Sequence, residues 1–205
     1  NHLYEAIRGD TVLISMMHVN NETGVIQDIQ AIGDMAHSQG VLFHVDAAQS
    51  ACRLPLDMQK LPVDLLSLSG HKAYGPKGVG VLYVSRAPKI HLVSQIHGGG
   101  HQHGLRSGTL PTHQIVGMGL AMSLVPGCWE KDLPRIRELR DQLWQGIANI
   151  GGVSLNGDFA HMISGCLNVH FEGVDGESLL LRLQDLALSQ GSACNAATMK
   201  PSHVL

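Results

Sequence analysis

Short apolar runs separated by one amphipathic segment dominate the first part of the chain. Residues 11–19 and 41–45 are nearly uninterrupted apolar runs, which are typical of strands buried on both faces of a sheet. Between them, residues 28–39 carry apolar side chains at helical spacing, with Asp28 suited to the N-cap and Gly40 to the position after the helix. This strand, helix, strand order predicts a mostly parallel sheet and an α/β fold.

Two further apolar runs extend the predicted sheet. Residues 64–69 form a strand that ends at Gly70, and residues 78–84 form another. The turn at residues 74–77 contains glycine and proline and is short, so we expect these two strands to be antiparallel neighbours.

The rest of the chain changes from strands to helices and polar loops. We place a domain boundary near residue 128, with residues 1–128 in one domain and 129–205 in a second, α+β domain. The expected elements are a glycine-rich loop over 96–109, helices over 113–125 and 129–150 with a break at Pro126 and Gly127, a strand over 166–171, a helix over 176–188 and a mobile loop over 189–198.

Composition narrows the class of protein. The 205 residues are 44% hydrophobic and carry a net charge of -3, which provides no basic face for nucleic acid. No apolar stretch approaches the roughly 20 residues that span a bilayer. The four cysteines are widely spaced, as expected of free thiols in a reducing compartment, so we expect a soluble, cytoplasmic protein. The chain lacks an initiator methionine, and we expect it to be a fragment.

An acid and a lysine follow two neighbouring strands of this sheet. Asp46 directly follows the apolar run 41–45, and Lys72 lies in the small polar turn after the run 64–69. The carboxyl ends of parallel strands form the edge at which α/β sheets bind ligands. A lysine opposite an aspartate is the pairing that pyridoxal 5'-phosphate needs, because the lysine forms a Schiff base with the aldehyde and the acid keeps the ring nitrogen protonated. Taken singly, a turn aspartate and a solvated lysine are the commoner interpretations.

Five short motifs add to this pair. They are His44-Val-Asp-Ala-Ala-Gln49, Ser69-Gly-His-Lys72, His97-Gly-Gly-Gly100, Arg106-Ser-Gly-Thr109 and Gly191-Ser-Ala-Cys194. In these motifs the chain resembles the cysteine desulfurases of the class V aminotransferase superfamily, more narrowly the housekeeping and nitrogen-fixation type that supplies sulfur for iron-sulfur clusters. The resemblance implies a type I pyridoxal phosphate-dependent transferase fold, with the later part of the large domain followed by the start of the small one.

The resemblance also implies residue roles and partners. It implies L-cysteine as substrate, a homodimer in which Thr109 reaches the cofactor phosphate of the other subunit, and delivery of sulfur to an iron-sulfur scaffold protein and other acceptors. The implied cofactor contacts are Lys72 with the aldehyde, Asp46 with the ring nitrogen, Gln49 and Asn21 with the ring hydroxyl, and Ser69 and His71 with the phosphate.

Cys194 differs from the other three cysteines in its sequence neighbours. Cys52, Cys128 and Cys166 lie within or beside apolar segments and fit small buried hydrophobes. Cys194 is surrounded by small and polar residues, which predicts an exposed, mobile thiol. We expect this thiol to attack the sulfur of the substrate and to carry it outward as a persulfide while alanine is released.

Metal binding is a second chemistry that the sequence raises. His97, His101 and His103 share the glycine-rich loop, but such a flexible segment without acidic or thiol partners is a weak metal site. The resemblance implies metal elsewhere, with Cys194 helping to bridge a nascent [2Fe-2S] cluster with the scaffold.

Other functions stay open at this stage. A selenocysteine lyase or an aminotransferase would share the fold, although an aminotransferase has no need of Cys194. A non-catalytic interaction or metal-binding module is the alternative of another class. The family's phosphate loop, its ring-stacking histidine and its later carboxylate-binding arginine match no segment of this chain, so we expect the 205 residues alone to bind cofactor poorly.

Overall fold

The structure is a computed structural model that describes residues 2–191, 202, 204 and 205. The backbone contacts divide the chain into two compact units. The first comprises residues 1–18 and 27–127, and the second comprises 19–26 and 128–205. The domain division near residue 128 stays a prediction.

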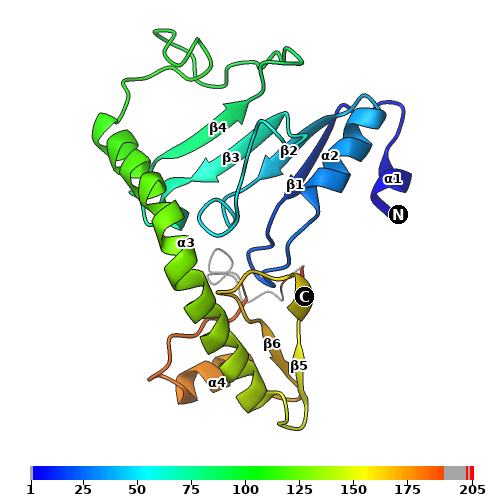
Figure 1. Cartoon of the computed structure of the whole chain (residues 1–205), viewed down its shortest axis with the longest axis vertical. Coiled ribbons are helices and arrows are strands. Elements are labelled where there is room, and N and C mark those ends of the chain that lie inside the picture. The colour runs from blue at the N-terminus through cyan, green and yellow to red at the C-terminus, as the bar shows by residue number, and fades with distance from the viewer. Residues whose placement is uncertain (1, 192–201, 203) are drawn as a thin grey trace. The chain divides into compact units, whose positions relative to one another are not determined.

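The first unit is built on a four-stranded sheet in the order β1-β2-β3-β4 (Figure 1). The strands are β1 (Leu13–Met17), β2 (Leu42–Asp46), β3 (Leu65–Ser69) and β4 (Gly80–Val84). β1, β2 and β3 are parallel, and β4 is antiparallel to β3. The sequence predictions of a mostly parallel sheet with an antiparallel edge strand are therefore confirmed.

Helix α2 (Ile29–Ser38) packs against one face of this sheet and closes the core (Figure 1). The Asp28 side chain accepts a hydrogen bond from Ala31 N at 3.0 Å, and Gly40 has a φ of +69°, as expected for a residue just past a helix. The short helix α1 (His2–Ala6) comes before β1. The buried core is formed by side chains of the sheet, of α2 and of the adjoining segments. It contains Ile14, Ile29, Ala36, Val41, Phe43, Val45, Ala47, Val63 and Leu66.

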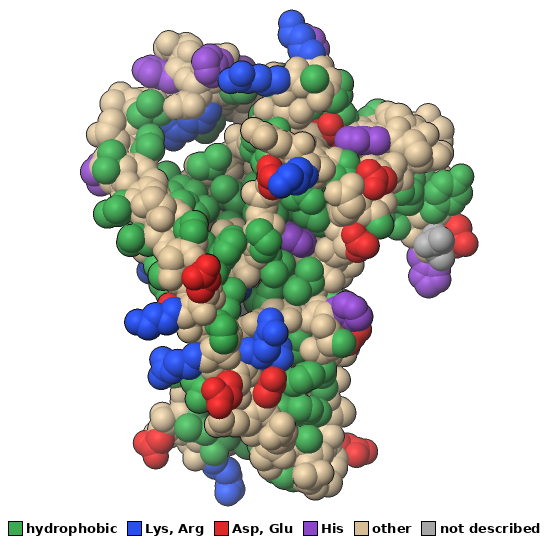
Figure 2. Space-filling view, viewed as in Figure 1, with side chains coloured by type: hydrophobic (Ala, Val, Ile, Leu, Met, Phe, Trp, Pro, Cys, Tyr) green, Lys and Arg blue, Asp and Glu red, His purple; other side chains and the backbone are tan. Residues whose placement is uncertain are grey.

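Helix α3 (Thr112–Ile147) runs through the predicted break without interruption. The break predicted at Pro126 and Gly127 is therefore wrong. An interior proline removes one backbone hydrogen bond and its ring crowds the preceding turn, at a cost of about 3 kcal/mol, and α3 continues through Pro126 despite that cost. Figure 2 shows hydrophobic side chains along this helix, and Val116, Leu120 and Leu124 are exposed.

The second unit holds a two-stranded antiparallel sheet, β5 (Val153–Leu155) and β6 (Val169–Phe171). The Arg140 guanidinium lies 4.5 Å from the centre of the Phe159 ring and donates to the carbonyl of Ile163, which ties α3 to the segment between the strands. Helix α4 (Gly176–Arg182) is shorter than the predicted helix over 176–188.

Two single-turn helices complete the elements. They are η1 (Gly70–Ala73) and η2 (Phe159–His161). In the described ranges, no helix combines the length and the apolar character needed to cross a membrane.

The buried carboxylate of Asp64 joins β2, β3 and α2. Asp64 is 2% exposed. Its Oδ2 accepts a hydrogen bond from Phe43 N at 2.8 Å and forms a second hydrogen bond with His37 Nε2 at 2.9 Å. A buried carboxylate stays favourable only when such partners satisfy it. Asp64 therefore fixes the amino end of β3 to β2 and to the last turn of α2.

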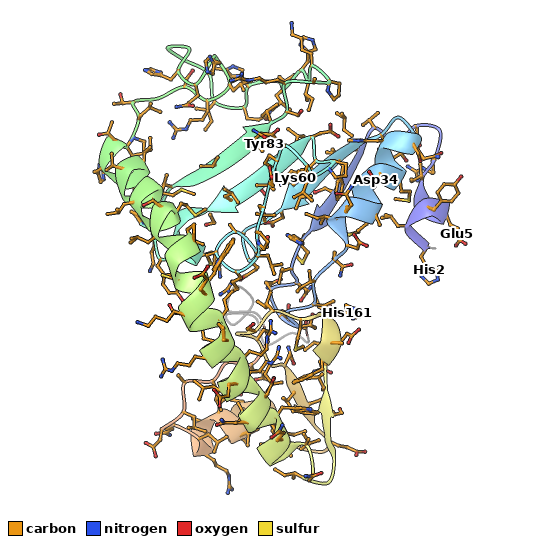
Figure 3. All side chains as sticks on the ribbon, viewed as in Figure 1. His2, Glu5, Asp34, Lys60, Tyr83 and His161 are labelled. Carbon is orange, nitrogen blue, oxygen red and sulfur yellow. The ribbon has the colours of Figure 1, made fainter. Side chains whose placement is uncertain are left out.

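We expect Asp64→Ala to lower the free energy of unfolding by about 2–4 kcal/mol, because it leaves the buried Phe43 N–H without an acceptor. Chemical denaturation followed by circular dichroism measures this loss. Asp34→Ala is the matched control, since Asp34 lies on the exposed surface of α2 (Figure 3) and should change stability by about 0.5 kcal/mol or less. Equal effects of the two substitutions would contradict the role of Asp64.

His18 makes the stability of the first unit depend on pH. Its side chain is buried and its Nδ1 lacks a hydrogen-bond partner among the described residues, and burial lowers the pKa of His18 from 6.5. Below pH 6.5 the unfolded chain therefore binds a proton that the folded chain resists, so stability falls as pH falls through this range.

We expect His18→Gln to remove that contribution. The variant's free energy of unfolding should fall less than that of the unaltered chain between pH 7.5 and 5.5, by up to about 1.4 kcal/mol per pH unit. Urea titrations at a series of pH values test this expectation, and parallel curves for the two proteins would contradict it.

Candidate active site

The carboxyl edge of β2 and β3 brings together five of the predicted site residues. Asp46, the last residue of β2, is paired in register with Ser67 of β3. β3 continues to Ser69 and passes directly into the single turn η1, which contains Lys72. Because the two strands are parallel, the acid and the lysine lie at the same edge of the sheet, as predicted.

Asp46 is held by the turn that follows it. Its Oδ1 accepts a hydrogen bond from Ala48 N at 2.9 Å, and its main-chain carbonyl accepts one from His18 N at 2.9 Å. The side chain is half-buried, and its second oxygen has no hydrogen-bond partner in the described part of the chain. That oxygen is available to a protonated ring nitrogen.

Gln49 lies in the same turn and is oriented by an arginine. Nη1 of Arg53 donates to the carbonyl of Gln49 at 2.8 Å and to its side-chain Oε1 at 3.1 Å. The side-chain oxygen is therefore occupied, and the Gln49 amide group is left as a hydrogen-bond donor. A donor at this position suits the ring hydroxyl that the sequence assigned to it.

Ser69 and His71 form a polar pair at the end of β3. Ser69 Oγ lies 2.8 Å from His71 Nδ1. Gly70 between them is buried, and a Cβ there would lie 2.9 Å from Val79 Cγ1 and 3.0 Å from Pro76 O, so only glycine fits. The hydroxyl and the imidazole could offer hydrogen-bond donors to a phosphate.

Lys72 presents its amine without an ionic partner. The side chain is half-buried and, within the described ranges, makes no ion pair or side-chain hydrogen bond. Its main-chain carbonyl accepts a hydrogen bond from Cys52 Sγ at 3.1 Å. Sequence reasoning treated Cys52 only as a small hydrophobe, so this contact with the lysine turn was missed.

The other three predicted residues belong to other segments of the chain. Thr109 is exposed and is the last residue of the glycine-rich loop of the first unit. Asn21 is exposed in a turn of the second unit. Cys194 lies outside the described residues, so its predicted role is untested.

The glycine-rich loop is held by its own hydrogen bonds. Gly108 N donates to His101 Nδ1 at 3.3 Å, and Gly100 N donates to the buried Ser107 Oγ at 3.2 Å. Among the described residues, no three histidine, cysteine or acidic side chains lie close enough together to hold a metal ion. The histidine metal site considered from the sequence therefore has no support in this part of the chain.

The donor set at the sheet edge fits pyridoxal phosphate. The cofactor aldehyde requires an amine, and its protonated ring nitrogen requires a carboxylate oxygen. Its ring hydroxyl can accept from an amide donor, and its phosphate can accept from a hydroxyl and an imidazole. These groups belong to Lys72, Asp46, Gln49, Ser69 and His71.

The chain is similar in sequence to curated cysteine desulfurases. "Cysteine desulfurase IscS" of Shewanella denitrificans is 58% identical over 201 residues, which are 98% of this chain and 50% of that protein. The chain spans about half the length of the curated relatives it matches.

Solved structures share the fold. DndA from Streptomyces lividans matches with a TM-score of 0.80 and 38% identity, covering 89% of this chain and 52% of that one. The structure titled "SspA in complex with cysteine" matches with a TM-score of 0.77 and 43% identity, covering 99% of this chain and 56% of that one. The predicted type I fold of pyridoxal phosphate enzymes is confirmed.

The sequence also matches one protein family. The model of the class-V aminotransferases matches residues 1–204, nearly the entire sequence, and the proteins of this family depend on pyridoxal phosphate. The chain belongs to the class-V aminotransferase family.

Proposed function

We propose that this chain is the part of a cysteine desulfurase that holds the cofactor lysine and the sulfur-accepting cysteine. The observation that carries the proposal is the shared edge at which Asp46 and the Lys72 turn meet, with Ser69 and His71 beside them. The names of the matched relatives, a cysteine desulfurase and a protein solved with cysteine, support this activity and this substrate.

Each side chain at the edge has a distinct task. Lys72 would hold the cofactor aldehyde through its amine, and Asp46 would keep a proton on the ring nitrogen. Ser69 and His71 would hold the phosphate, and Gln49 would donate to the ring hydroxyl. Pyridoxal phosphate, when bound there, supplies the electron sink that weakens bonds around the α-carbon of an amino acid.

Cys194 would determine which reaction follows. Its thiolate attacks the sulfur of the substrate cysteine, and an S–S bond forms while the Cβ–S bond of the substrate breaks. The electron pair of the broken bond stays with carbon, which takes up a proton and leaves as alanine. The sulfur remains on Cys194 as a persulfide, so the step needs no external oxidant or reductant.

The remaining assignments belong to the whole protein. Thr109 is exposed and would reach the cofactor phosphate of a second copy in a homodimer, and Asn21 would approach the ring hydroxyl. The persulfide would pass to an iron-sulfur scaffold or another sulfur acceptor, with Cys194 bridging a [2Fe-2S] cluster during transfer. An aminotransferase is disfavoured, because it has no use for a sulfur-accepting thiol.

Addition of pyridoxal phosphate tests the cofactor site. We expect an absorbance band near the visible edge that is absent in Lys72→Ala and weakened in Asp46→Ala, because these residues bind the aldehyde and the ring nitrogen. Lys60→Ala is the matched control, since Lys60 is an exposed surface lysine (Figure 3). A band of equal strength in Lys72→Ala would contradict the assignment.

Mass spectrometry of Cys194 after incubation with L-cysteine and pyridoxal phosphate tests the reaction. We expect one added sulfur atom on the peptide that carries Cys194 and release of alanine, in this chain or in a protein of full family length. Cys194→Ala should lower alanine release at least about a hundredfold, because the nucleophile is lost. Cys128→Ala, at an exposed cysteine of α3, should leave alanine release unchanged. Alanine formed at the normal rate without Cys194 would refute the proposed function.

A further inference from the structure

The orientation of the Gln49 amide decides what this side chain can offer to the cofactor ring. An amide presents an acceptor oxygen at one end and a donor NH2 at the other, and the two ends have nearly the same shape. An NH2 that faces the ring hydroxyl stabilises its deprotonated oxygen, whereas an amide oxygen in that place requires the hydroxyl to keep its proton. The protonation state of the ring hydroxyl therefore depends on the group that fixes the amide.

Arg53 fixes the amide, because its guanidinium can only donate. Its Nη1 lies 3.1 Å from Gln49 Oε1. A guanidinium stays protonated and has no acceptor atom, so the amide atom that faces it is the oxygen and not the nitrogen. The same Nη1 donates to the Gln49 main-chain carbonyl at 2.8 Å, and both side chains are half-buried. One nitrogen therefore holds the backbone and the side chain of Gln49 together.

The turn that carries both residues is anchored to the sheet. Ser50 is fully buried, and its hydroxyl donates to the Ala47 carbonyl at 3.3 Å. Arg53 N donates to the carbonyl of Ser50 at 2.8 Å. Ala47 N donates to the carbonyl of Ser67 on β3 at 2.9 Å. The backbone under the Arg53 side chain is thus held in place, which limits the positions that the guanidinium can reach.

We infer that Arg53 is a positioning residue for the cofactor, which orients the Gln49 amide so that its NH2 donates to the deprotonated ring hydroxyl. Arg53 acts in this role through Gln49 and not on the cofactor itself. Without the guanidinium, the amide can rotate by half a turn, and its oxygen then favours a protonated hydroxyl. The inference rests on the proposed function, because that function assigns Gln49 to the ring hydroxyl.

The Gln49 amide can be observed in the chain without cofactor. In nuclear magnetic resonance spectra, its side-chain NH2 signals are identified by their loss in Gln49→Ala. We expect a heteronuclear NOE of this NH2 as high as that of the surrounding backbone, and a lower value in Arg53→Met, which keeps the aliphatic length but removes the donors. Arg53→Lys should keep the NH2 rigid, because a single nitrogen makes both contacts.

The absorbance of bound pyridoxal phosphate reports the state of its ring hydroxyl. The deprotonated form absorbs near the visible edge, and the protonated form absorbs in the near ultraviolet. We expect Arg53→Met to move absorbance from the first band to the second and to raise the Kd for pyridoxal phosphate about threefold to tenfold, as expected for one hydrogen bond. In a Gln49→Ala background, Arg53→Met should change neither value, because Arg53 acts through Gln49.

Arg86→Met provides the matched control, since Arg86 is an exposed arginine of the same unit, and it should leave the NOE, the Kd and the bands unchanged. Arg53→Ala takes the place of Arg53→Met if that variant does not fold. A Gln49 NH2 as rigid without Arg53 as with it, or an effect of Arg53→Met that persists in Gln49→Ala, would overturn the inference alone. An unaltered chain with a rigid NH2 and no band for bound cofactor would refute the proposed cofactor site, and the inference with it.

Discussion

The parallel pairing of β2 and β3 is the constraint on which the candidate site depends. Successive side chains of a strand point to opposite faces, so a slip of one residue would turn Asp46 away from Ser67 and move Lys72 along the edge. The apolar residues Phe43 and Val45 resist such a slip, because their burial against α2 would be lost. Asp64 fixes the other end of the same strand pair through Phe43 N and His37.

The elements that depend on local pattern could be predicted from the sequence. Buried strands and the capped helix α2 leave clear runs and periodicity, and parallel order then places Asp46 and Lys72 at one edge. The end of α4 could not be found in this way. Residues beyond Arg182 continue a leucine pattern, but Leu186 is 57% exposed, and a short helix without packing is marginal in water. At Pro126 the error was the opposite one, because α3 continues through a proline that the local sequence favours as a helix end.

Two sets of contacts that sequence reasoning missed join distant parts of the chain. Glu22 lies in a polar turn, and nothing local distinguishes it from an exposed acid. Its burial follows from Cys166, Asn168 and Ser202, which are 144, 146 and 180 residues away. Cys52 is similar, because its contact with the Lys72 carbonyl depends on the fold of the turn after β2.

The chain connects the sheet edge and the Glu22 turn through β1. Residues 19–26 belong to the second unit, and the chain re-enters the first unit at Gln27. A β-bridge pairs Val19 with Ile26 at the two ends of this segment. His18 precedes this segment and Gln27 follows it. The His18 N–H donates to the Asp46 carbonyl, and the His18 carbonyl accepts a hydrogen bond from Gln27 N. His18 and Gln27, between which the chain leaves and re-enters the first unit, are therefore both fixed by backbone hydrogen bonds within that unit.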